Sequence, residues 1–198
     1  MIGARRADKV AVSGRDFDQR MNDQTAAQTP GRREIVESLD REFARLHAKS
    51  CAVIEKTSVE ILYAVPAQAG LAALGSNVNF TSSVGESLLR CASVIEQTFG
   101  GITSNLWDDP FEWTLPEYLS TTHKINEHLA EVEATRHQAF NSFVDDDCLR
   151  KHVAVPSGET RLLVDLLLDT LIRAAAYQAQ ALLVLNTLSD LSPSGFII

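Results

Sequence analysis

Residues 159–188 read ETRLLVDLLLDTLIRAAAYQAQALLVLNTL, and this stretch decides the fold class. It contains no proline or glycine, and its leucines recur at three- and four-residue steps, so it predicts one long helix from about Glu159 to Leu188. Because the segment is apolar on nearly all sides, we expect this helix to be buried among others. The small side chains at 174–176 would let a neighbouring helix approach, or would leave a cavity.

Three further segments show the same helical period. Ser83 and Glu86 fit a capping box at the start of one of them, and Gly100-Gly101 is expected to end it, because glycine adopts the left-handed conformation at little cost. Ser120 or Thr121 can cap another. These helices are predicted at 33–57, 83–99 and 120–143, with connections at 64–81, 105–116 and 145–158. No segment shows a strand period, so the fold class is all-α, a four-helix bundle.

Composition limits the classes of partner. The chain has 198 residues, with 18 basic against 26 acidic side chains and a net charge of −8. An acidic balance argues against a nucleic-acid groove, because phosphate binding needs a basic surface. The sequence also lacks the run of roughly 18 apolar residues that a membrane-spanning helix requires. We therefore expect neither nucleic acid nor membrane as a partner.

The chain divides into three predicted regions. Residues 1–32 are polar, lack a sustained period and carry a net charge of +2, which predicts a disordered tail. Alternatives are a regulatory arm, or a true start at Met21. Residues 33–190 form the helical domain, and 191–198 form a C-terminal extension. No apolar segment of a secretory signal follows the first basic residues, so we expect a bacterial, cytoplasmic protein.

The three cysteines do not form a disulfide framework, because they are odd in number and far apart. Cys51 and Cys91 lie in apolar helical patterns and are expected to be small core residues. Cys148 follows three aspartates, which raise the pKa of a thiol and make it a poor nucleophile.

Histidine spacing does not favour a metal centre. A ferritin-like site needs Glu-x-x-His pairs, and a zinc protease site needs His-Glu-x-x-His; both patterns are absent from the sequence. His128 with Glu131, and Glu133 with His137, are spaced to share a helix face. Such pairs are more typical of solvent-facing contacts than of metal ligands.

The polar residues of the most apolar helix are more informative. Arg173, Tyr177 and Gln180 follow one another at four- and three-residue steps and share a face, and Ser87 lies inside the second predicted helix. A buried arginine is costly unless it is paired or borders water. Either Arg173 reaches the surface or pairs with a structural acid, or these residues line a polar pocket at the bundle centre.

At these residues the chain resembles the DinB-like (YfiT-like) superfamily of four-helix bundles. The resemblance covers about residues 33–190 and rests on Ser83–Leu89 and Arg173–Gln180. In that superfamily three histidines bind a divalent metal, and some members are thiol-dependent transferases or metal-dependent hydrolases. The three ligand positions here hold Ser87, Arg173 and Tyr177, which are poor ligands for zinc or nickel. The resemblance therefore implies the fold with a degenerate metal site and no cofactor.

Three functions follow as hypotheses. The first is a metal-free bundle whose pocket, lined by Ser87, Arg173 and Tyr177 with Gln180, Trp107 and Trp113 at its edge, binds a small polar or anionic ligand, or is merely structural. The second is a transferase or hydrolase, with Tyr177 as general acid and Arg173 as a carboxylate clamp. The third is a homodimeric interaction protein, which the resemblance implies and which the apolar Phe196-Ile197-Ile198 end could support.

Overall fold

The structure, a computed structural model, describes residues 31–66, 81–110, 118–190 and 196–197. The chain divides into two units, Met1–Gly31 and Arg32–Ile198, and the fold reported below is that of the second. The predicted tail and most of the predicted C-terminal extension lie outside the described residues. Trp113 lies outside them as well.

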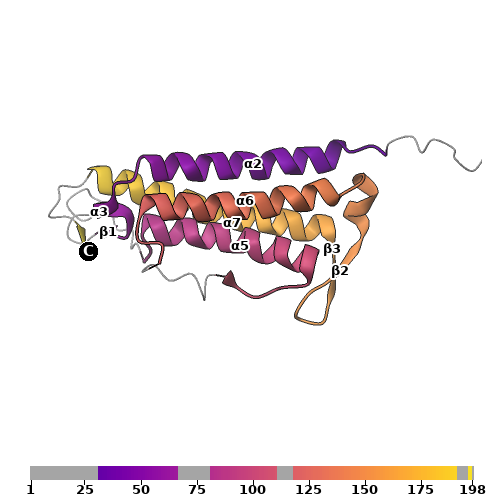
Figure 1. Cartoon of the computed structure of the whole chain (residues 1–198). Helices are drawn as coiled ribbons and strands as arrows, with labels where there is room; N and C mark the ends of the chain where they lie inside the picture. Colours follow the sequence, from indigo (N-terminus) through magenta and orange to yellow (C-terminus); the bar gives the residue numbers. More distant parts are fainter. Residues whose placement is uncertain (1–30, 67–80, 111–117, 191–195, 198) are drawn as a thin grey trace, which may run out of the picture. The chain divides into compact units, whose positions relative to one another are not determined.

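The described part is mostly helical, which confirms the all-α fold class. Its four long helices are α2 (Glu34–Glu55), α5 (Val84–Ser104), α6 (Thr122–Ser142) and α7 (Leu163–Asp190). Helix α2 packs against α6 and α7, and α5 packs against the same two helices (Figure 1). A short helix, α3 (Val59–Leu62), follows α2 and was not predicted.

Helices α5 and α6 run in the same direction, so the chain must return along α5 between them. The hydroxyl of Tyr63, just after α3, donates to the backbone oxygen of Leu119, three residues before α6. The same tyrosine ring lies against Gly85 in the first turn of α5. The starts of α5 and α6 are therefore neighbours.

Two of the predicted helix caps are confirmed. The Ser83 hydroxyl accepts a hydrogen bond from the Glu86 backbone N–H at 3.1 Å, and the Thr121 hydroxyl accepts one from the Lys124 N–H at 3.3 Å. The Glu86 carboxylate accepts from Arg90. Helix α2 is capped from elsewhere in the chain, since one Asp146 oxygen accepts from the N–H groups of 35 and 36.

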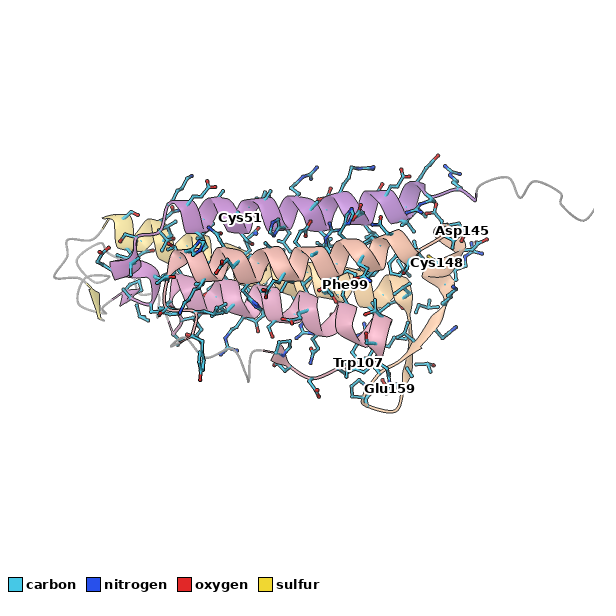
Figure 2. The ribbon with its side chains drawn as sticks, viewed as in Figure 1. Cys51, Phe99, Trp107, Asp145, Cys148 and Glu159 are labelled. Atoms are coloured by element: carbon cyan, nitrogen blue, oxygen red, sulfur yellow. The ribbon has the colours of Figure 1, made fainter. Side chains whose placement is uncertain are left out.

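Aromatic rings fill the centre of the core. Phe43 of α2, Phe99 of α5 and Phe140 of α6 pack with ring centroids 5.3 to 5.7 Å apart, in the edge-on and tilted arrangements that aromatic pairs favour (Phe99 is labelled in Figure 2). The hydroxyls of Thr98 and Thr170 lie 2.7 Å apart in the core and join α5 to α7.

The prediction that Gly100-Gly101 ends its helix is wrong. Helix α5 continues through both glycines to Ser104 and ends at Asn105, which takes the left-handed conformation with φ 55°. The glycines serve packing instead. A Cβ atom at Gly101 would lie 2.4 Å from the Trp107 indole, so only glycine lets this ring lie against the helix.

The predicted start of the last helix, at about Glu159, is also wrong. Residues Thr160–Leu162 form strand β3, which pairs antiparallel with β2 (His152–Ala154), and α7 begins only at Leu163. The hairpin between them turns at Gly158, whose φ of 83° favours glycine. A second ladder joins β1 (Val65–Pro66) to β4 (Phe196–Ile197). These short strands were not predicted, because two or three residues show no period.

Helix α7 is not buried on all sides, contrary to the prediction. Its inner face packs in the core through residues such as Leu167, Ala174 and Leu188, but its outer face is exposed over several turns. The described residues include no helix that is both long and apolar enough to cross a membrane.

Candidate functional site

The structure places the three residues at the resembled metal positions in different surroundings. Ser87 is fully buried, and its hydroxyl donates to the backbone oxygen of Ser83 at 2.8 Å. The Arg173 side chain is 50% exposed and faces Asp169 one turn earlier. Tyr177 is half-buried against the core. No hydrogen bond or ion pair among the described residues joins the three.

Of the two alternatives left open for Arg173, the structure shows the first, since its side chain reaches the surface near Asp169. Gln180 is half-buried on the same helix. Trp107 lies on the segment that follows α5 (Figure 2). Its indole N–H donates to the side-chain oxygen of Asn105, which is not one of these residues. Ligand binding at Ser87, Arg173 and Tyr177 stays a prediction that this geometry does not strengthen.

Arg136 of α6 is the arginine that the fold buries, with 2% of its side chain exposed. It forms ion pairs with Asp40 of α2 and with Glu133, and its guanidinium lies over the Phe140 ring. Burial alone would lower the pKa of Arg136, but the hydrogen bonds and charges of Glu133 and Asp40 outweigh it and raise that pKa. Arg136 therefore joins two helices.

A cavity of about 540 Å³ lies between α5, α6 and residues 105–110. This volume is within the range of small-molecule sites. Side chains of α5 hold the segment 105–110 in place: the Gln97 amide donates to the Trp107 backbone oxygen at 2.9 Å, and the Ser93 hydroxyl donates to Asp109 at 2.6 Å. The described lining residues are Glu96, Gln97, Gly100, Thr103, Ser104, Leu106, Asp108, Pro110, His128 and Thr135.

Glu96 of α5 and His128 of α6 lie next to each other in the wall of this cavity. Glu96 Oε2 and His128 Nε2 are 3.9 Å apart, which is close enough for an ion pair but too far for a hydrogen bond. The same Glu96 oxygen is buried and has no hydrogen-bond partner among the described residues. The Glu96 side chain as a whole is 39% exposed, so water or a ligand can supply the donor that this buried oxygen needs.

The partial burial of Glu96 and the charges near it shift the pKa of its carboxyl group. Burial raises the pKa of Glu96, the charge of His128 opposes the rise, and the nearby Glu131 adds to it. The described lining holds two carboxylates, Glu96 and Asp108, and no lysine or arginine. A positively charged group entering the cavity would therefore be attracted, and would favour ionised Glu96.

The thiols and the acidic pairs do not form an alternative centre. Burial raises the pKa of Cys51 and Cys148, and that of Cys91 to about 12, so all three are protonated near neutral pH. Among the described residues, no group of three or more His, Cys, Asp or Glu side chains is arranged to hold a metal ion. Glu133 binds Arg136, and His137 contacts Asn141.

Neither Glu96 nor the role of residues 105–110 was predicted from the sequence. Glu96 follows the buried Ile95 on α5, so its position alone suggests an ordinary helix edge. The available signal was the glycine pair one turn later, which allows the next segment to fold back. A Cβ atom at Gly100 would lie 3.1 Å from the Leu106 backbone oxygen.

Comparison with known proteins adds no assignment: no family model, no curated protein and no solved structure matches this chain.

Proposed function

We propose that this protein is a DinB-like four-helix bundle that binds a small organic cation in the cavity between α5, α6 and residues 105–110. The observation that carries the proposal is the buried Glu96 Oε2, which lacks a donor beside a cavity of about 540 Å³. An ammonium or amidinium group would supply that donor as a charge-assisted hydrogen bond. The proposal also includes the absence of a bound metal, a cytoplasmic location and a homodimeric state.

The cavity favours a ligand with a charged end and an apolar body. Its polar groups gather at Glu96, His128 and Asp108, whereas Leu106 and Pro110 offer an apolar wall. Pockets of this kind orient a ligand by a few polar contacts and bind it mainly by burying apolar surface. The expected ligand is thus a cation, whereas a central pocket lined by Arg173 predicts a polar or anionic ligand.

Binding is favoured over catalysis because the three thiols and the hydroxyls of Ser50, Ser87 and Thr98 have no activating base; the Ser93 hydroxyl, which donates to the Asp109 carboxylate, is the exception. The thiols are protonated near neutral pH, as their raised pKa values show. The buried hydroxyls of Ser50, Ser87 and Thr98 donate to backbone oxygens of their own helices. A nucleophile needs a neighbouring base that takes its proton.

The test is chemical-shift mapping with two probes of nearly equal shape. Phenethylammonium carries the charge, and 2-phenylethanol is its neutral control. We expect phenethylammonium to shift the backbone amides of Gly100, Thr103, Leu106 and His128, and 2-phenylethanol to shift them less at the same concentration. Shifts confined to the surroundings of Arg173 and Tyr177, or equal shifts with both probes, would contradict the proposal.

A further inference from the structure

The outer face of α7 carries an apolar stripe that no described part of the chain covers. Its large side chains are well exposed: 43% for Leu168, 69% for Ile172, 44% for Leu182, which lies at the edge of this face, and 52% for Leu183. Alanines that are also exposed lie between them. The α7 stripe is defined as Leu168, Ile172, Ala175, Ala176, Ala179 and Leu183.

The α7 stripe is symmetric about its own midpoint, between Ala175 and Ala176. Counting outward, Ile172 and Ala179 are equally far from this point, and so are Leu168 and Leu183. Residues at these steps lie on one side of a helix. A two-fold axis through the midpoint would therefore place each residue of one helix opposite its counterpart on a second, antiparallel copy.

We propose that the α7 stripe is the interface of an isologous homodimer in which two α7 helices cross antiparallel at Ala175 and Ala176. In this arrangement Ile172 packs over Ala179 of the second copy, so a large side chain meets a small one. Leu168 meets Leu183, and the central alanines let the two helices approach closely. A closed two-fold pair needs such a self-complementary surface.

Charge favours a second copy in this orientation. Asp165 lies beyond one end of the stripe and faces Asn186 in the antiparallel pair, whereas a parallel pair would set Asp165 against Asp165. A specific interface buries about 1,000 Å² or more in total, so each copy must contribute about 500 Å² from the stripe and its flanks. The proposal also explains why the sequence of α7 is apolar on nearly all sides.

This inference rests on the proposed homodimeric state and is independent of the cavity ligand. The test is sedimentation of the full chain, unmodified and with Ile172→Asp. Ile35→Asp is the matched control, because Ile35 is an isoleucine of α2 that is 54% exposed and lies off the stripe. We expect a dimer for the unmodified chain and for Ile35→Asp, and a monomer for Ile172→Asp with unchanged helix content.

The possible failures are distinguishable. A monomeric unmodified chain overturns the homodimeric state together with this interface. A dimer that persists in Ile172→Asp overturns the interface alone. Cysteine pairing then tests the orientation: mixed Leu168→Cys and Leu183→Cys chains should cross-link to each other, and preferential cross-linking of Leu168→Cys to itself would contradict the antiparallel arrangement.

Discussion

Replacing Arg136 by methionine tests whether a buried ion pair stabilises the packing of α2 on α6. Methionine keeps a similar length but removes the charge that Asp40 and Glu133 share. Deleting one partner of a fully buried pair costs about 3–5 kcal/mol. Here both carboxylates keep some contact with solvent, at 37% and 24% exposure, so we expect the lower loss of about 2 kcal/mol.

The assay is the free energy of unfolding in urea, with the melting temperature alongside. For a domain of this size each kcal/mol lowers the melting temperature by about 2–4 °C, so we expect a decrease of about 6 °C. Arg45→Met is the matched control, because Arg45 pairs with Glu42 at the same spacing on the surface. Exposed pairs contribute about 0–1 kcal/mol.

Two outcomes would refute this reasoning. If Arg136→Met loses no more stability than Arg45→Met, the ion pairs do not join the helices energetically. If Arg136→Met is more stable than the unmodified protein, the free-energy cost of dehydrating Arg136 exceeds the favourable energy of its ion pairs with Asp40 and Glu133, as has been found for some buried pairs.

Two further predictions concern the cavity. Gly101→Ala should destabilise the fold by about 1–3 kcal/mol and change the Trp107 fluorescence, since the new Cβ would lie 2.4 Å from the indole. Ser104→Ala is the control. An unchanged spectrum with unchanged stability in Gly101→Ala would contradict the close packing. Burial raises the pKa of Glu96, so the folded state holds this proton more tightly and the contribution of Glu96 to the free energy of unfolding should decrease as the pH rises above about 4. Glu96→Gln should reduce that decrease in urea titrations, and identical pH slopes would contradict the raised pKa.

The helices and two caps could be predicted because their signals are local. Ser83 and Thr121 cap their own helices, so neighbouring residues contain the whole signal. The two arginines show the limit of this reasoning. Arg136 lies one turn from the buried Val132 and Phe140, and the stripe of α6 indicates its inward side. On α7 both faces are apolar, so the sequence gives no indication that Ala174 faces inward and Arg173 outward.

The candidate site could not be predicted because it depends on long-range packing. Glu96 becomes a site residue only when His128 of another helix lies next to it and residues 105–110 fold back along α5. The glycine pair at 100–101 permits that return, but a glycine pair after an apolar stripe is equally typical of a helix end.

The most direct test of the central claim is calorimetric titration of phenethylammonium into the unmodified protein, Glu96→Gln and Glu127→Gln. Glu127 is an exposed acid of α6 outside the described cavity lining, so its variant makes the same change in net charge. A charge-assisted hydrogen bond contributes about 1.5–3 kcal/mol, and we therefore expect at least a tenfold loss of affinity in Glu96→Gln and none in Glu127→Gln. Equal affinities in all three proteins would contradict the claim that Glu96 receives the cation.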